Sequence, residues 1–393
     1  MKLFEELLKN NKVITFKKLS EIAKIVRGNR ITKKDLAING FPVKSGGIGV
    51  LGYYHSYNRK GEQLTIAQYG TAGLVQWQEN NFWANDVCLT IESSPEILNK
   101  YIYYFLLSKQ KDIFKSNIKA TPEKINITFL NNLLIPIVDL ETQIEIINIL
   151  NKFTEYSAEL KAELKARDEQ YKFYRDKLLS DNNLSNDASI SGIKSNIAKV
   201  KDYIDYIQPT KFIVKSDKYN PEFKTPVLTA NQKFILGYTD EKQNIFHSSK
   251  ENPVIIFDDF TTDLKWVDFD FKIKSSAIKI LTPKNSNINI KYFYYWLNFI
   301  HNTEESSKEH KRHWISVFAE KLFTLPVLSV QNKIVKVLDN FESILKDLNI
   351  GLPAEEAKRQ QQYEYYRDAI FKYLETGIID NKGIGERERE RAD

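Results

Sequence analysis

Residues 138–153 read VDLETQIEIINILNKF, and 188 positions later residues 326–341 read PVLSVQNKIVKVLDNF. When the two stretches are aligned, the shared positions are Leu140/Leu328, Gln143/Gln331, Ile146/Ile334, Leu150/Leu338 and Phe153/Phe341. A second shared phrase follows each block, QYKFYRD at 170–176 and QYEYYRD at 362–368. Two blocks in the same order indicate an internal duplication, whose period is far too long for a solenoid repeat.

The repeated blocks have the periodicity of long helices. In the first copy, a seam of positions spaced three and four residues apart runs without a break from Gln143 to Leu178. This heptad pattern predicts a rod of about 57 Å. The second copy keeps the seam until Gly351 and Pro353, where we expect a break, with the helix resuming at the proline.

A long amphipathic helix needs a partner that covers its apolar stripe. We expect each helix to pair with the other copy in the same chain. Two alternatives are that each helix packs on its own globular segment and that the chain dimerises. The two globular segments, 1–132 and 183–322, each precede a long helix and contain short strand patterns and turns. Each segment ends in an aromatic helical stretch, at 98–110 and 290–300. The duplication is therefore expected to include the globular segments.

The predicted fold class is α+β, with two α/β domains joined by two long helices that form an antiparallel coiled coil with pseudo-twofold internal duplication. The predicted organisation is a first globular domain at 1–132, a first helical repeat at 133–182, a second globular domain at 183–322, a second helical repeat at 323–380 and a low-complexity tail at 381–393.

Composition restricts the class of protein. Hydrophobic residues make up 42% and charged residues 27%, which is typical of a globular chain, and no run of 18 apolar residues predicts a membrane span. Cys88 is the single cysteine, so an intramolecular disulfide is impossible and a reducing cytoplasm is the simplest compartment. Residues 1–12 predict a short amphipathic helix and not a signal peptide. The net charge of +6 permits a polyanionic partner without requiring one.

The two helical repeats resemble the central repeats of type I restriction-modification specificity (S) subunits. The stretches GTAGLVQWQENNFWANDVC (70–88) and NPVIIFDDFTTDLKWVDFDFKIKSSAIKIL (252–281) are similar to segments of that family's target recognition domains. The resemblance covers residues 12–375. One departure is Pro136 with Val138, where the family often has two prolines.

The resemblance implies a non-catalytic subunit. Each target recognition domain would read one half of a bipartite, asymmetric site in double-stranded DNA. The helices would set the spacing between the half-sites and bind two DNA-adenine methyltransferase subunits, and endonuclease–translocase subunits would join the complex. No cofactor is expected in this chain, because S-adenosylmethionine, ATP and magnesium would belong to the partner subunits.

Motifs for catalysis do not occur in the sequence. There is no Gly-rich methyl-donor loop, no Asn-Pro-Pro-aromatic tetrad and no phosphate-binding loop. His310 and His313 are the one close histidine pair, which is weak support for a metal site. A rival prediction is a magnesium-dependent nuclease that uses Asp258, Asp270 and Lys272. A second rival is an adaptor that does not bind DNA and whose helices bind only partner helices.

Sequence-specific DNA binding needs base-edge donors and acceptors among phosphate contacts. The candidates in the first domain are Arg30, Lys44, Ser45, Tyr53, Tyr54, His55, Asn58, Arg59, Lys60 and Thr71. The candidates in the second domain are Thr229, Asn231, Gln232, Thr261, Thr262, Lys274, Ser275, Ser276, Lys311 and Arg312. Lys311 and Arg312 stand beside Trp314, as expected for a phosphate clamp.

Overall fold

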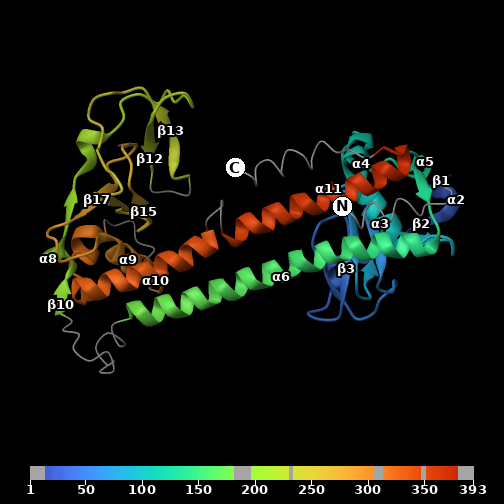
Figure 1. Cartoon of the computed structure of the whole chain (residues 1–393), viewed down its shortest axis with the longest axis horizontal. Helices are drawn as coiled ribbons and strands as arrows, with labels where there is room; N and C mark the ends of the chain where they lie inside the picture. The colour runs from blue at the N-terminus through green and yellow to red at the C-terminus, as the bar shows by residue number, and fades with distance from the viewer. Residues whose placement is uncertain (1–13, 181–195, 230–232, 304–312, 347–350, 379–393) are drawn as a thin grey trace. The chain divides into compact units, whose positions relative to one another are not determined.

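The computed structural model describes residues 14–180, 196–229, 233–303, 313–346 and 351–378 (Figure 1). The predicted amino-terminal helix at 1–12 and the low-complexity tail at 381–393 lie outside these residues, as do residues 181–195. Contacts divide the chain into two compact units, residues 1–161 with 355–393 and residues 162–354. No helix among the described residues is long and apolar enough to cross a membrane.

The first unit contains three sheets. The four-stranded antiparallel sheet has the order β2 (Ala23–Arg27), β8 (Cys88–Ser93), β5 (Gln63–Ala67) and β6 (Val75–Gln78). The three-stranded sheet has the order β4 (Gly52–Tyr54), β3 (Phe41–Lys44) and β7 (Trp83–Ala84), and the two-stranded sheet pairs β1 (Thr15–Lys18) with β9 (Leu134–Ile137). The shorter helical elements are α2 (Leu19–Ile22), η1 (Lys33–Asp35), α3 (Asn99–Ser108), α4 (Gln110–Ser116) and α5 (Ile127–Asn132).

The second unit repeats this strand order. Its four-stranded sheet consists of β11 (Ile204–Ile207), β17 (Ile278–Pro283), β14 (Val254–Asp258) and β15 (Leu264–Val267). Its smaller sheets are β13 (Ile235–Thr239), β12 (Thr225–Leu228) and β16 (Lys272–Ile273), and β10 (Asn196–Lys199) with β18 (Leu322–Leu325). The other helical elements are α8 (Val200–Tyr203), η2 (Pro209–Phe212), α9 (Ile290–Thr303) and η3 (Trp314–Phe318). The prediction that the duplication includes the globular segments is confirmed.

The long helices are α6 (Leu140–Leu179), α10 (Leu328–Lys346) and α11 (Leu352–Thr376). The unbroken 40 residues of α6 confirm the helix predicted from the heptad seam. The second copy is divided into α10 and α11, and Pro353 lies in the first turn of α11, where its missing N–H has no cost. The predicted break is therefore confirmed.

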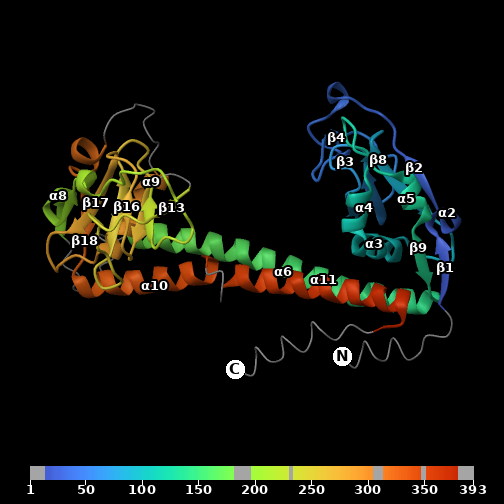
Figure 2. The same ribbon diagram turned by 90° about the horizontal axis from the view of Figure 1, so that it is seen from above.

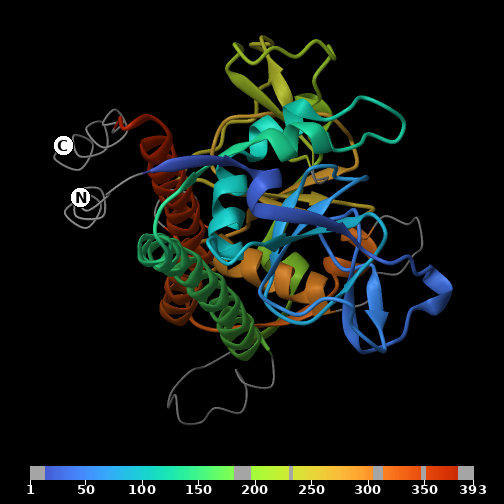
Figure 3. The same ribbon diagram turned by 90° about the vertical axis from the view of Figure 1, so that its right-hand side faces the viewer.

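The helices pair within the chain, and the pairing is antiparallel in each unit. In the first unit α11 runs beside the amino-terminal part of α6 (Figures 2 and 3), with Phe153 near Tyr366 and Lys161 near Glu356. In the second unit the carboxyl-terminal part of α6 packs on α10 through Tyr174 and Phe341. Intramolecular pairing of the long helices is thus confirmed.

One buried glutamine in each repeat joins the long helix to its domain. The Gln143 side chain is fully buried, accepts from the Leu98 N–H at 2.9 Å and donates to the Glu96 and Val138 carbonyls at 3.0 and 2.9 Å. Gln331 is also fully buried and makes the corresponding three bonds, from the Asn289 N–H and to the Asn287 and Pro326 carbonyls, at 2.7, 3.0 and 2.8 Å. A buried amide with all its partners orients the chain segments that meet there.

Candidate nucleic-acid interface

The first-unit candidates gather on the three-stranded sheet β4-β3-β7 and its loops. Lys44 ends β3 and pairs in parallel with Ala84, and the Asn85 N–H donates to the Lys44 carbonyl at 2.9 Å. Thr71 joins this group because its N–H donates to the Gly46 carbonyl at 2.8 Å. The loop that carries Arg30 lies against the same sheet. The structure therefore assembles residues that are widely separated in the sequence.

Two glycines allow the loops at this site to approach one another. An added Cβ on Gly46 would lie 2.2 Å from the Tyr69 carbonyl oxygen, so no larger residue fits without movement of the backbone. Gly70 has a φ of 78°, which favours glycine, and packs against Gly46 in return. This contact holds the Ser45 loop beside the Thr71 turn.

Aromatic side chains line the same sheet. Tyr54 of β4 contacts Trp83 of β7 edge-on, with ring centroids 4.7 Å apart, and its ring lies 4.0 Å from that of His55. Tyr53 remains exposed on the strand. The Trp83 indole N–H donates to the Asn29 carbonyl at 2.9 Å, which fixes the loop next to Arg30. Exposed aromatic and basic groups on a braced sheet suit contacts with nucleic-acid bases and phosphates.

Two candidates have internal roles in the fold. The Asn58 side-chain amide accepts from the Ala84 N–H at 2.7 Å and donates to the Ala84 carbonyl at 3.0 Å. The Arg59 guanidinium donates to the Thr90 hydroxyl at 2.9 Å and to the Arg27 carbonyl at 3.0 Å. These side chains hold the strands together, whereas the neighbouring Lys60 side chain is exposed.

The second unit presents candidates at the corresponding place. Leu228 of β12 pairs in parallel with Ile273 of β16, and the Lys274 N–H donates to the Leu228 carbonyl at 3.1 Å. Thr229 follows β12 directly, as Lys274 follows β16, and Ser275 and Ser276, the next residues after Lys274, are exposed. The Thr229 N–H donates to the Phe234 carbonyl at 2.9 Å, and the Lys274 ammonium pairs with Asp217. The backbone arrangement matches that of Lys44 and Asn85.

Thr261 and Thr262 lie in the turn between β14 and β15. Thr261 is exposed, and its N–H donates to the Asp258 carboxylate at 3.0 Å. Thr262 is only 8% exposed, and its hydroxyl lies 2.9 Å from His301 Nδ1. Thr262 also has a φ of 60°, an uncommon conformation for a β-branched residue. The structure therefore exposes Thr261 and gives the Thr262 hydroxyl an internal partner.

Four candidates lie outside the described residues: Asn231, Gln232, Lys311 and Arg312. Trp314, expected beside the last two as part of a phosphate clamp, is 1% exposed and packs edge-on against Phe257 in the core, with ring centroids 5.2 Å apart. Its backbone N–H donates to the buried Asp259 carboxylate at 2.8 Å. Trp314 is thus a core residue.

The structure does not support the nuclease alternative, because its three side chains have separate structural partners. Asp258 accepts from the Phe260 and Thr261 N–H groups and so caps its turn. Asp270 lies 2.8 Å from His247 Nδ1 and accepts from the Ser248 N–H at 3.1 Å. Lys272 is 1% exposed and pairs with Glu241 at 3.0 Å. Two carboxylates that shared a metal would need free oxygens directed at one point.

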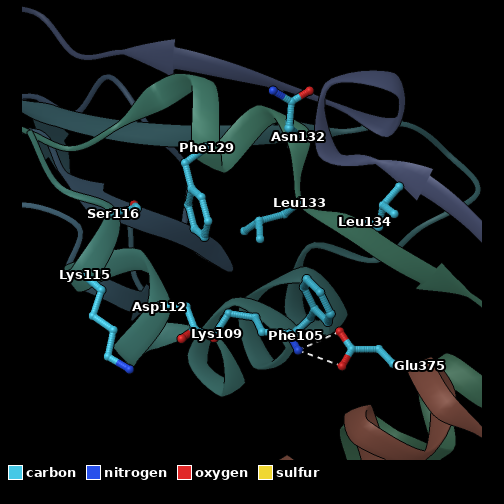
Figure 4. Close-up of a pocket in the computed structure, with 10 residues that line it drawn as sticks. All are labelled: Phe105, Lys109, Asp112, Lys115, Ser116, Phe129, Asn132, Leu133, Leu134 and Glu375. Atoms are coloured by element: carbon cyan, nitrogen blue, oxygen red, sulfur yellow. Dashed lines mark hydrogen bonds and ion pairs between the residues drawn. The ribbon is translucent and has the colours of Figure 1, made fainter.

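No group of three or more His, Cys, Asp or Glu residues in the described part of the chain is placed to hold a metal ion. A surface pocket in the first unit lies between α3, α4, α5 and the end of α11 (Figure 4). At its edge Lys109 and Glu375 form an ion pair at 2.6 Å. None of the candidate DNA-binding residues lines this pocket, so it is separate from the proposed interface.

Two residues that organise the candidate interface, Trp83 and Asn85, were not among the residues predicted from the sequence. The Asn85 side chain is 5% exposed, accepts from the Ile31 N–H at 3.0 Å and donates to the Ile31 carbonyl at 3.3 Å. It therefore holds the loop that carries Arg30 through the backbone of Ile31. Both residues fall within the stretch 70–88 that carried the family resemblance, but no local pattern marks them as neighbours of Arg30.

Comparisons with known proteins agree with this architecture. Residues 11–170 match the family model described as the type I restriction modification DNA specificity domain. A type I restriction enzyme specificity subunit of Escherichia coli is 42% identical over 205 residues, which is 50% of this chain and 49% of that protein. The match thus spans about half the length of this relative.

Longer matches extend the similarity. A Mycoplasma pneumoniae protein described as a type I specificity subunit is 31% identical over 240 residues, 59% of this chain and 90% of that protein. A crystal structure of the type I S subunit from M. genitalium has a TM-score of 0.61 at 18% identity and covers 92% of this chain and 97% of that one, which supports the fold. The chain belongs to the family of type I restriction-modification specificity subunits, the non-catalytic DNA-recognition subunits of those systems.

Proposed function

We propose that the chain directs a type I restriction-modification complex to a bipartite, asymmetric site in double-stranded DNA. Each unit would read one half-site with its three-stranded sheet and the adjoining loops. The observation that carries this proposal is the repeated parallel strand pair, β3 with β7 and β12 with β16, which presents different side chains on the same backbone.

The difference between the two surfaces accounts for the asymmetry of the site. The first strand pair is followed by Ser45 and the buried Asn85, whereas the second is followed by Thr229 and Lys274. Base edges are distinguished by the donors and acceptors that side chains present in the groove. Two surfaces with one backbone arrangement and different polar groups would select two different short sequences.

The partners and modules of the complex are part of the proposal. Two DNA-adenine methyltransferase subunits would dock on the long helices, endonuclease–translocase subunits would join them, and S-adenosylmethionine, ATP and magnesium would be bound by these partners in the cytoplasm. The functional modules would follow the boundaries predicted from the sequence, with recognition domains at 1–132 and 183–322. The helix pair would set the spacing between the half-sites.

The test is methylome sequencing of cells that carry the complete system, combined with DNA binding of the assembled complex over a range of salt concentrations. We expect one asymmetric methylated motif of two short half-sites with a fixed spacer. We also expect an affinity that falls linearly on logarithmic axes as salt rises, because phosphate contacts release counterions. If the complete complex shows no salt-sensitive affinity for DNA, the proposal is overturned. The chain would then be an adaptor whose helices bind only partner helices.

A further inference from the structure

The tyrosines of each repeated heptapeptide contact the phenylalanine that ends the other repeated block. In the first unit the Phe153 ring lies 5.4 Å from that of Tyr366, nearly parallel at 26°, and 6.4 Å from that of Tyr363. In the second unit the Phe341 ring lies 5.7 Å from that of Tyr174, also at 26°, and 6.3 Å from that of Tyr171. The same three-ring contact therefore occurs twice.

The arginine of each heptapeptide completes the contact. The Arg367 guanidinium lies 5.4 Å from the centre of the Tyr363 ring and is held by Asp368 at 2.7 Å. Arg175 lies 5.9 Å from the Tyr171 ring and is held by Asp176, also at 2.7 Å. Both arginine side chains are nearly covered, at 12% and 13% exposure. We call Phe153, Tyr363, Tyr366 and Arg367 the first aromatic cluster, and Phe341, Tyr171, Tyr174 and Arg175 the second.

The sequence in the middle of α6 does little to fix the register of α6 against its partner helix α11. Residues 157–166 read SAELKAELKA, so the tetrapeptide ELKA occurs at 159–162 and again at 163–166. Within this repeat, a slip of four residues, about 6 Å along the helix, would put Leu164 at the position of Leu160 and Lys161 at the position of Ser157. Both leucines are only half-buried. The ion pair of Lys161 with Glu356, at 3.6 Å on the surface, adds little selectivity.

The aromatic clusters do not tolerate the same slip. In the first unit it would bring either Arg359 and Gln362 or Arg367 and Ile370 opposite Phe153 in place of the tyrosines. In the second unit the corresponding residues opposite Phe341 would be Arg167 and Gln170 or Arg175 and Leu178. None of these residues is aromatic, so the ring contacts would be lost in either direction.

We propose that the two aromatic clusters are register locks, which act together with the contacts of α11 to the first domain, Phe105 with Phe371 and Lys109 with Glu375. They select one alignment of the helix pair where the repeated ELKA segment is compatible with more than one. Their residues are positioning residues and do not contact DNA. A consequence, which rests on the proposed function, is that the clusters determine which spacer length between half-sites the complex accepts. The repeated heptapeptide would thus be retained in both copies because each copy aligns the other.

The register can be measured with engineered cysteines in the full-length chain. Lys161→Cys with Glu356→Cys reports the observed alignment, and Lys161→Cys with Gln360→Cys or Leu352→Cys reports a slip of one turn. The native Cys88 is 1% exposed and burial raises the pKa of its thiol to about 12, so it will not compete under mild oxidation. We expect the first pair to crosslink and the other two to remain at background in the otherwise unchanged chain.

Adding Phe153→Ala should raise the yield of a slipped pair at least about fivefold relative to the observed pair. Tyr366→Phe should not, because the ring remains. The matched control is Tyr156→Ala, which removes an exposed aromatic ring from the same helix. If Phe153→Ala does not fold, Phe153→Leu retains apolar volume without the ring and should give the same shift. Slipped pairs that stay at background while the unfolding temperature falls would overturn the proposal, because packing alone would then explain the cluster.

The consequence for specificity has its own measurement. In the complete system, Phe153→Leu should add methylated sites whose spacer differs by one or two base pairs, with both half-sites unchanged, because about 6 Å corresponds to about two steps of 3.4 Å. A bipartite motif whose spacer does not change, despite slipped crosslinks, would refute the link to spacing. Absence of any bipartite motif with the unchanged chain would instead refute the proposed function and leave the crosslinking result intact.

Discussion

Asn58 and Lys60 are two residues apart in the first unit, yet their side chains have different surroundings. The Asn58 amide makes two hydrogen bonds to the backbone of Ala84 and so joins the 58–60 turn to β7. The Lys60 ammonium is exposed. Replacement of Asn58, which holds the strands together, should therefore change the stability of the fold. Replacement of Lys60, an exposed cation beside the candidate interface, should change DNA affinity.

Asn58→Ala should lower the free energy of unfolding by about 1–3 kcal/mol, because two backbone groups lose their partner. Lys60→Ala should leave the free energy of unfolding within about 0.5 kcal/mol of the unchanged chain. It should reduce the slope of log K for DNA binding against log salt concentration by about 0.9, the value for one lost phosphate contact. Denaturant unfolding and salt-dependent binding of the assembled complex measure the two effects. An altered methylation motif in Asn58→Ala at unchanged stability would show that this side chain reads a base.

Asp139 caps the amino terminus of α6. Its carboxylate accepts from the Thr142 N–H at 2.8 Å and from the Thr142 hydroxyl at 2.9 Å. The backbone hydrogen bond from Thr142 lowers the pKa of Asp139 below its ordinary value. Because the folded-state pKa is lowered, the capping interaction is fully present above the unfolded pKa and is lost as the pH falls through the folded value.

Asp139→Ala should therefore lower stability by about 1 kcal/mol near neutral pH, and this difference from the unchanged chain should shrink as the pH falls below about 4. Urea unfolding across this pH range measures it. Asp139→Asn is the control, since asparagine caps a helix without titrating. A difference between the Asp and Ala chains that persists undiminished at low pH would mean that the charge does not matter.

At the scale of the element, α6 contributes to both units without interruption. Its amino-terminal part shares a core with Phe371 and Leu374 of α11, and its carboxyl-terminal residue Leu179 shares a core with Leu338 of α10. If the helix pair sets the spacing between the half-sites, as proposed, a change in the length of α6 would change that spacing. The ELKA repeat in its middle is the natural place for such a change.

Insertion of four residues in register between Leu160 and Leu164 should lengthen α6 by about 6 Å. The spacer between the methylated half-sites should then grow by one or two base pairs, while both half-sites stay the same. Methylome sequencing of the insertion variant is the measurement. An active variant that retains the original spacer would exclude a role for α6 in spacing and leave the helices a docking role only.

At the scale of the whole molecule, one scaffold occurs twice with different polar groups on its strand ends. The strand order and the buried glutamine are common to both units, and each unit has its own hydrophobic core. Each unit also has a smaller apolar cluster, formed by Phe82, Ala84 and Cys88 in the first unit and around Ile256, Val267 and Phe271 in the second. Units with separate cores can diverge on their binding surfaces without disturbing one another.

Replacement of residues 1–132 by the corresponding segment of another specificity subunit should change one half-site and leave the other intact. The donor segment must preserve the pairing of β1 with β9, in which Thr15 lies opposite Ile137 and Lys18 opposite Leu134 across the junction. It must also preserve the contact of Phe105 with Phe371. The methylated motif of the hybrid system is the readout. A hybrid that alters both half-sites would contradict separate reading by the two units.

The sequence by itself determined the duplication, the long helices and the break before Pro353. The duplication and the long helices follow from local periodicity, which the sequence displays in both copies. The break follows from the backbone preference of proline. The aromatic stretches before each repeat were predictable for the same reason, since each pattern is complete within about ten residues.

Only the tertiary structure decided which polar side chains have internal partners in the fold and which remain available to contact DNA. Asn58, Arg59 and Thr262 have the composition of a DNA-binding loop, but their side chains are bonded to groups elsewhere in the fold. The parallel pairing of β3 with β7 and the contact of Phe153 with Tyr366 join positions about 40 and about 210 residues apart. Such contacts depend on how the chain closes on itself, because hydrogen-bond partners and ring contacts between distant residues leave no trace in local periodicity.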